Sequence, residues 1–486
     1  MAPPACGGMR LSPVLVALSF FGIALAGCLE NPEPPVVPSE TAPAPTLPTG
    51  IVRFAADGSI LAPVVDQVLA QAQYILTGHR GAEPTMGITK SGAIFMATFE
   101  TVIRSTDGGQ TWEVAYDFAV PGAPVDPFFN ADPMMWVDPI TDRVYNAPMY
   151  PLLLCSSIVW SENDGQSWTH RPLACPAIQP FDRQTLASGP PGPRAPPQAG
   201  LAHPTVLYLC YNQLASTSCL MSYDGGLTWP VNVPVWDRAT APPGSGSCAG
   251  QPGHTAVAPD GTVVVPKSWF CAGLFLSVSY DSGLTWEVRA GPQVGGDTLS
   301  PEVAFAPDGT LYALWQGKDH LTYLARSPDV GKTWDGPWIV SPPDVRSTVF
   351  AALAAGDDGR VAMAFLGTRD TDEYPSRAPD ETRWHLFFVT TEDGTAQSPT
   401  FTAYQATPED DPVQIGCVWI GGGGNPCRNM LDFIDGAVGA DGTFYVSYTE
   451  GCTEGCAGVR DAGPTDSRDR QAALGILRGW SLRASA

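Results

Sequence analysis

The stretch STDGGQTW, residues 105–112, returns four more times along the chain. The copies are SENDGQSW (161–168), SYDGGLTW (222–229), SYDSGLTW (279–286) and SPDVGKTW (327–334), and successive tryptophans are 56, 61, 57 and 48 residues apart. Asp and Gly in the middle favour a tight turn between strands, because Gly adopts positive φ and Asp accepts hydrogen bonds from nearby amides. We call these five stretches the Asp turns, and a shorter sixth copy reads TEDG at residues 391–394.

A second repeat lies upstream of the Asp turns and reads as an alternating strand, a DG turn and another strand. It is clearest in HTAVAPDGTVVV (254–265), PEVAFAPDGTLYALW (301–315), AALAAGDDGRVAMAF (351–365) and DGAVGADGTFYVSY (435–448). Looser copies cover 84–97 and 133–147, while PTVLYLCYN (204–212) keeps only the first strand. Each unit therefore holds four antiparallel strands, which is typical of a propeller blade.

Composition agrees with an all-β protein and excludes other classes. The 486 residues include 51 Gly and 49 Pro, and both residue types interrupt helices. Hydrophobic residues make up 44% of the chain, which is too many for a disordered protein. The net charge of −23 repels phosphate backbones, so we predict no nucleic-acid partner.

The pattern S-x-D-x-G-x-T-W resembles the Asp-box, or bacterial neuraminidase repeat, of sialidase-like β-propellers. The resemblance covers residues 51–486 and implies a single propeller of six or seven blades. Seven is preferred, because units begin near residues 79, 130, 201, 251, 299, 348 and 431. The strand IVRFAADGSIL (51–61) is expected to complete the ring by pairing with the last blade. In the family the Asp-box is structural, which gives Asp107, Asn163, Asp224, Asp281 and Asp329 a turn-forming role.

The resemblance does not carry sialidase chemistry with it. That chemistry needs three arginines that clamp a carboxylate, a Tyr nucleophile activated by a Glu, and an Asp acid/base. The family's first arginine belongs to an R-I-P motif, and this sequence has Ala82 there, with Arg80 two residues early. The region expected to hold the Tyr reads LDFID (431–435). Hydrolysis of sialosides by the usual mechanism is therefore disfavoured.

Inner strands of a propeller start at one face, which we call the channel mouth. Aligning the units on their DG turns places six polar residues there, in two neighbouring columns: Glu83, Asp132 and His203, then His254, Glu302 and Asp435. Such a ring of carboxylates and imidazoles suits a sugar or a divalent cation, or supplies acid/base groups. The alternative is a solvated rim with no ligand. No cofactor is expected otherwise.

The N-terminus resembles a lipoprotein export signal. Residues 11–27 form an apolar stretch after Arg10, and the stretch ends in LAGC, which predicts lipidation at Cys28 and removal of residues 1–27. An ordinary signal peptide and an uncleaved anchor are the alternatives. Residues 28–50 are rich in Pro and carry only acidic charges, as a spacer between membrane and folded domain would.

Ten further cysteines fall into sequence neighbours, which predicts disulfides and an oxidising compartment. The simplest pairs are Cys155–Cys175, Cys210–Cys219, Cys248–Cys271, Cys417–Cys427 and Cys452–Cys456. A metal site at Cys452 and Cys456 is the rival interpretation, but no His or second close Cys pair lies near it.

Three functions follow from these features. The first is a monomeric, membrane-anchored surface protein that binds a glycan or a protein over the channel face. The second is an exo-α-sialidase or another glycoside hydrolase. The third is a purely structural propeller that docks partner proteins.

Overall fold

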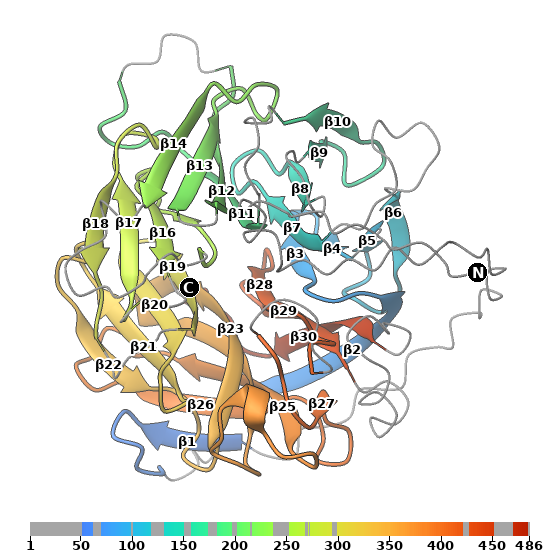
Figure 1. Ribbon diagram of the computed structural model, residues 1–486, viewed down its shortest axis with the longest axis vertical. Helices are drawn as coiled ribbons and strands as arrows, with labels where there is room; N and C mark the ends of the chain where they lie inside the picture. The colour runs from blue at the N-terminus through green and yellow to red at the C-terminus, as the bar shows by residue number, and fades with distance from the viewer. Residues whose placement is uncertain are drawn as a thin grey trace, which may run out of the picture. The chain divides into compact units, whose positions relative to one another are not determined.

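The computed structural model describes residues 51–61, 70–98, 101–117, 131–149, 157–173, 182–196, 202–213, 216–236, 252–267, 271, 273–293, 299–420, 427–451 and 470–484. Within them the chain forms seven antiparallel blades arranged in a ring (Figure 1), which confirms the seven-bladed β-propeller. The only helices are two 3-10 turns, η1 (Asp357–Gly359) and η2 (Pro375–Arg377), in these ranges.

Blades 1 to 5 are consecutive in sequence. Blade 1 holds β3 (Thr85–Ile88), β4 (Ile94–Ala97), β5 (Thr101–Ser105) and β6 (Glu113–Asp117). Blade 2 holds β7 (Ala131–Val137), β8 (Val144–Met149), β9 (Ser157–Ser161) and β10 (Thr169–Pro172). Blade 3 holds β11 (Asp182–Gly189), β12 (Val206–Gln213), β13 (Ser216–Ser222) and β14 (Val231–Trp236). Blade 4 holds β15 (Ala256–Val257), β16 (Val263–Lys267), β17 (Phe275–Ser279) and β18 (Glu287–Ala290), and blade 5 holds β19 (Leu299–Phe305), β20 (Leu311–Gln316), β21 (Thr322–Ser327) and β22 (Asp335–Ile339).

Blades 6 and 7 both use strands from the N-terminal part of the chain. Blade 6 holds β23 (Ser347–Ala355), β24 (Val361–Thr368), β25 (Arg383–Thr391) and β26 (Thr400–Gln405), with β1 (Ile51–Ala55) added outside β26 and β27 (Gln414–Ile415) paired to β25. Blade 7 holds β28 (Asp435–Val438), β29 (Phe444–Glu450), β30 (Gln471–Arg478) and, as its outer strand, β2 (Gln71–Arg80).

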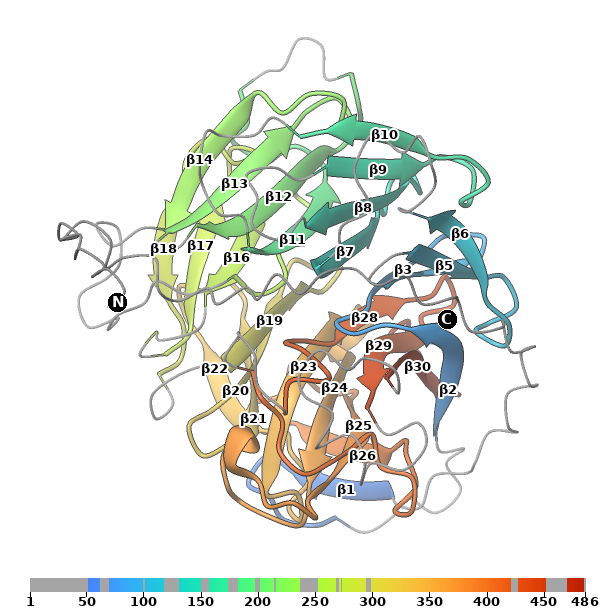
Figure 2. The same ribbon diagram turned by 45° about the vertical axis from the view of Figure 1, so that its right-hand side comes forward.

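The predicted ring closure was therefore wrong in its strand. The segment 51–61 does not pair with the last blade, because β1 pairs with β26 of blade 6, Arg53 opposite Thr402. Closure is made by β2, which runs beside β30 with Leu76 opposite Ala473 (Figure 2). The segment QAQYILTGHR, β2, lacks a DG turn and a clean alternation, so no hairpin could be predicted for it.

The third unit was also misplaced. VLYLCYNQ, β12, is the second strand of blade 3, and the inner strand is β11, with Leu186 opposite Leu209. β11 reads DRQTLASG, whose few apolar residues hide it from a periodicity search. The two strands are joined by a connection much longer than a DG turn, which is why the turn alignment failed here.

The Asp turns hold their own loops by hydrogen bonds within eight residues. The Asp107 carboxylate accepts from the Ser105 hydroxyl at 2.8 Å, from the Thr111 amide at 3.0 Å and from the Thr111 hydroxyl at 2.6 Å. Asp224, Asp281 and Asp329 repeat this arrangement. Asn163 accepts through its amide oxygen from the Ser167 amide at 2.9 Å. The sixth copy is similar, since Asp393 accepts from Thr391 and Thr400.

Each Asp turn also packs against the blade before it. At Gly165, φ is +77° and a Cβ would lie 2.7 Å from the Phe95 ring of blade 1. The preceding blade in turn donates a hydrogen bond to a carbonyl of the turn, as Arg143 does to Gly225 O at 2.6 Å. The same role falls to five other donors: Arg478, Arg104, Tyr223, Arg289 and Arg326. The turns thus seal six of the seven junctions between blades.

Two of the five predicted disulfides are confirmed, Cys210–Cys219 and Cys417–Cys427. Cys271 is disulfide-bonded as well. The other predicted partners, Cys155, Cys175, Cys248, Cys452 and Cys456, lie outside the described residues, as do Cys28 and the whole of segment 1–50. The bonded cysteines indicate an oxidising environment.

Candidate functional site at the channel mouth

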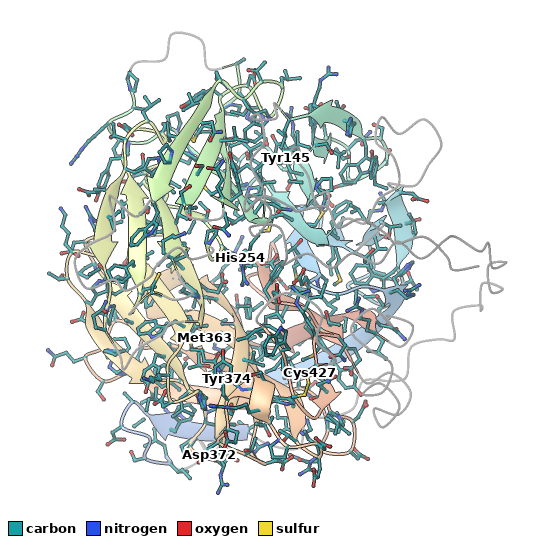
Figure 3. The ribbon with its side chains drawn as sticks, in the orientation of Figure 1. Tyr145, His254, Met363, Asp372, Tyr374 and Cys427 are labelled. Carbon is teal, nitrogen blue, oxygen red and sulfur yellow. A yellow bond between two sulfur atoms is a disulfide. The ribbon has the colours of Figure 1, made fainter. Side chains whose placement is uncertain are left out.

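The inner strands of all seven blades surround a central channel of about 520 Å³. Its wall is largely apolar and takes one stretch from each blade, for example Met86, Met135, Leu186, Ala256, Val303, Leu353 and Ala437. Polar groups are concentrated at its ends. His254, Glu302 and Asp435 lie where inner strands begin, and Lys90, Asp142 and Arg483 lie near their far ends. Figure 3 shows His254 near the middle of the ring.

One predicted column converges on a single imidazole. Nδ1 of His254 lies 2.8 Å from Oε2 of Glu302 and 3.9 Å from Oδ1 of Asp435. The second Asp435 oxygen accepts the Met86 amide at 2.9 Å, which fixes the carboxylate against blade 1. Blades 4, 5 and 7 thus contribute one polar group each, and their side chains are only 9–20% exposed.

The charges of this cluster stabilise one another. Burial alone would lower the pKa of His254, but the two carboxylates outweigh burial and raise the pKa to about 9. Burial raises the pKa of Glu302 and of Asp435, although the imidazolium opposes both shifts. At neutral pH the cluster therefore presents a protonated imidazole between two acidic groups that take up protons more readily than free ones.

Two residues that the sequence interpretation missed complete this corner. The Phe433 ring meets the His254 ring edge-on, with centroids 5.7 Å apart. The Arg183 guanidinium lies over the Phe433 ring, 5.5 Å from its centroid. Its charge also lowers the pKa values of His254 and Glu302. Arg183 escaped notice because β11 was not recognised as an inner strand.

Glu83, from the other column, belongs to a separate buried network beside the mouth. It is fully buried, and its Oε1 accepts the Asp432 amide at 2.7 Å. Arg470 lies near Glu83, and burial lowers the pKa of Arg470 to about 10. The charge of Glu83 raises this pKa, whereas the charges of Arg80 and Arg428 lower it. Arg428 in turn pairs with Asp432 at 2.5 Å. Three arginines therefore gather next to Asp432 and Phe433, a convergence that the sequence did not predict.

The remaining two predicted mouth residues do not join the cluster. His203 lies at the opposite end of the blades, because it precedes the second strand of blade 3 and not the first. There its ring contacts Thr205, whose hydroxyl donates to Asp138 just after β7. Asp132 begins the inner strand β7, at the expected end, but its side chain lies outside the described part.

A buried lysine and an insertion lie near the mouth as well. Lys267 is fully buried at the end of β16, where burial lowers its pKa to about 7, and its ammonium donates to the Thr217 hydroxyl. The insertion of blade 6 packs on blade 5, since Nδ1 of His320 lies 2.8 Å from the Asp372 carbonyl and its ring meets the Tyr374 ring edge-on. The insertion thus forms part of the rim.

No group of three His, Cys, Asp or Glu side chains is arranged to hold a metal ion in the part of the chain that the structure describes. At the mouth, the imidazole of His254 occupies the position between the two carboxylates that a cation would take. Among the same residues, no helix is long and apolar enough to span a bilayer.

No protein-family model and no curated protein matches this chain. Solved structures do, at low identity. A protein of unknown function from Dyadobacter fermentans is 16% identical over 82% of this chain and 94% of its own, with a TM-score of 0.39. The phage phi92 endosialidase is 13% identical over 88% and 73%, with a TM-score of 0.44. The intramolecular trans-sialidase of Ruminococcus gnavus is 12% identical over 92% and 96%, with a TM-score of 0.37. At these identities and TM-scores, the similarity carries no argument about family or activity.

Proposed function

We propose that this protein is an exported, membrane-anchored β-propeller that binds a glycan at its channel mouth. The observation that carries the proposal is the His254 imidazole between Glu302 and Asp435, at one end of the central channel. Carboxylates accept hydrogen bonds from sugar hydroxyls, a protonated imidazole donates one, and the Phe433 ring offers an apolar surface beside them. Two disulfides and the predicted lipid at Cys28 suit a protein that works outside the cytoplasm.

A glycan array with the purified protein tests this proposal. Binding is expected to fall by at least about tenfold in Glu302→Gln, since a charged acceptor contributes about 1.5–3 kcal/mol. Glu287→Gln is the matched control, because Glu287 is exposed on the outer strand of blade 4 and should leave binding unchanged. Equal glycan binding by both variants would refute the glycan site. A surface pull-down that captures a protein partner equally well with the parent and with Glu302→Gln would refute it too.

A second candidate function is glycoside hydrolysis, and one observation favours it. Glu302 and Asp435 both have raised pKa values, as a general acid requires, and the arginines around Glu83 are a potential clamp for an acidic sugar. Against it, the region where the resemblance implies a Tyr nucleophile reads LDFID (431–435) and holds no Tyr. Turnover of a fluorogenic sialoside that is abolished by Glu302→Gln would replace binding by catalysis.

A further inference from the structure

The junction between blades 6 and 7 is built differently from the other six. In blades 1 to 5 the third strand turns into the fourth through an Asp turn, which packs on the preceding blade. In blade 7 the third strand is β30 and the fourth is β2, which comes from the other end of the chain. No hairpin joins them, so this junction has no Asp turn. The segment after β30 contacts blade 6 instead, where the Leu482 carbonyl accepts the Asp357 amide at 2.9 Å.

A pocket of about 860 Å³ occupies this junction, on the Asp-turn face and so at the opposite end of the blades from the mouth. We call it the junction pocket. One wall is the outer part of blade 6, where Arg53 on β1 lies opposite Thr402 on β26, and Thr402 opposite Thr390 on β25. Residues paired in this way project from the same face of a sheet, so a guanidinium and two hydroxyls line one row.

The facing side of the pocket, formed by the segment after β30, is tied to blade 6 by hydrogen bonds. Trp480 donates through Nε1 to Glu392 at 3.1 Å, and Arg360 donates to the same carboxylate oxygen at 2.7 Å. The Arg360 guanidinium also lies over the Trp480 ring, 4.9 Å from its centroid, and Nε donates to the Ser481 carbonyl at 2.6 Å. The acidic groups of the pocket are thus already occupied: Glu392 by these two donors, Asp393 by Thr400 and Asp441 by Thr443.

Arg53 stands apart from this pattern. Its guanidinium makes no hydrogen bond or ion pair in the described structure, although every arginine at the sealed junctions donates to the next blade. An unengaged, half-buried arginine beside the Thr402 hydroxyl is suited to an anionic group. The pocket lining holds three arginines and three carboxylates, and Arg53 is the arginine on its β1 wall.

We infer that the junction pocket is a second binding site, for a small hydroxylated organic anion. Arg53 binds its carboxylate or phosphate, Thr402 binds a hydroxyl, and the Trp480 ring packs against its carbon skeleton. The pocket is far larger than an inorganic ion requires, which favours a ligand of monosaccharide size or above. The site is independent of the channel mouth.

Isothermal titration calorimetry of the full protein with D-glucuronate, glucose 6-phosphate and glucose tests the inference. At least one of the two anions is expected to bind and neutral glucose is not, and the stronger anion tells a carboxylate from a phosphate site. Arg53→Gln is expected to weaken binding at least about tenfold, which corresponds to the loss of one charge-assisted hydrogen bond. Thr402→Val should weaken it less.

Two controls separate the possible outcomes. Arg377→Gln removes an exposed arginine on the opposite face and should leave the affinity unchanged. Glu302→Gln should also leave it unchanged, and a loss in that variant would move the anion to the mouth and overturn the junction site. Failure of both anions to bind at concentrations up to about 10 mM, or equal affinity in Arg53→Gln, overturns it as well.

Discussion

The junction between blades 1 and 2 is closed, whereas the junction between blades 6 and 7 holds a pocket. At the first, Gly165 lies against the Phe95 ring and Arg104 donates to the Asp164 carbonyl. At the second, a Cβ added to Gly479 would meet no atom closer than the Ala70 Cα at 3.8 Å, and Arg53 donates to no described residue. The two junctions differ in connectivity, because blade 7 has no hairpin between its third and fourth strands. A propeller that borrows its last strand from the other end of the chain loses one sealing turn.

The largest effect is expected from adding a methyl group at each junction. Gly165 and Gly479 have nearly the same φ, +77° and +78°, so Ala costs about 1–2 kcal/mol of conformational strain at either position. At Gly165 the new Cβ would also lie 2.7 Å from the Phe95 ring, and overpacking adds about 1–3 kcal/mol. Urea denaturation should therefore show a loss of about 3 kcal/mol for Gly165→Ala and about 1 kcal/mol for Gly479→Ala. Equal losses would mean that the first junction is not packed more tightly.

The next largest effect is a pH dependence of stability that comes from His254 at the channel mouth and not from either junction. The pKa of His254 is raised to about 9 in the folded protein, so its contribution to stability is complete below pH about 6.5 and is lost as pH rises through 9. Thermal denaturation of the parent protein should show a fall on the order of 2 kcal/mol over this window. His254→Gln should remove that fall, while Arg53→Gln keeps it. A parent protein with a flat profile from pH 6.5 to 9 would contradict the charged cluster.

A smaller contrast is expected from the two arginines. Arg104 donates to the next Asp turn and pairs with Glu113, so Arg104→Gln should lower the free energy of unfolding by about 1–2 kcal/mol. Arg53 has no such partner in the described chain, and Arg53→Gln should stay within about 0.5 kcal/mol of the parent. The pair of melting temperatures measures this directly. A large drop in the melting temperature of Arg53→Gln would show that Arg53 stabilises the fold and is not available to a ligand.

The smallest effect concerns acid. Burial alone would raise the pKa of Asp107, but hydrogen bonds from Thr111, Ser105 and Gln110 lower it overall. Its contribution is therefore present above pH about 3.9, the unfolded value, and is lost as pH falls through the lower folded value. Asp107→Asn keeps the acceptor oxygen, as Asn163 does in the second turn, so stability at pH 7 should change by less than about 1 kcal/mol. The acid limb of a stability profile should become shallower, and an unchanged limb would contradict the lowered pKa.

The sequence predicted what depends on residues close together in the chain. Asp107, Ser105 and Thr111 meet within seven positions, so their turn could be read from spacing. The approach of His254, Glu302 and Asp435 was also predictable, because each lies six residues before the Asp of its DG turn and equivalent positions in blades face one axis. In a repeat protein, residues at the same distance from their DG turns therefore occupy equivalent positions in different blades.

The features that could not be predicted from the sequence depend on contacts between segments that share no repeated motif. Blade 3 joins β11 to β12 by a long connection, so counting from turns put His203 at the wrong end and missed Arg183. The pairing of β2 with β30 links residues with no common motif. The gathering of Arg80, Arg428 and Arg470 around Glu83 follows from that pairing, because Arg80 ends β2 and Arg470 precedes β30.

The pairing of β2 with β30 also sets the order in which the molecule can be completed. The Thr77 hydroxyl donates to the Ala472 carbonyl across 395 residues. At a synthesis rate of about 5–20 residues per second, the nascent β2 waits on the order of half a minute for its partner. Until then the growing chain has an unpaired strand at its beginning and another at its end, both open to pairing with other molecules. Blade 7 can therefore form only after β30 has been synthesised, and chains released before Gln471 cannot complete the ring of blades.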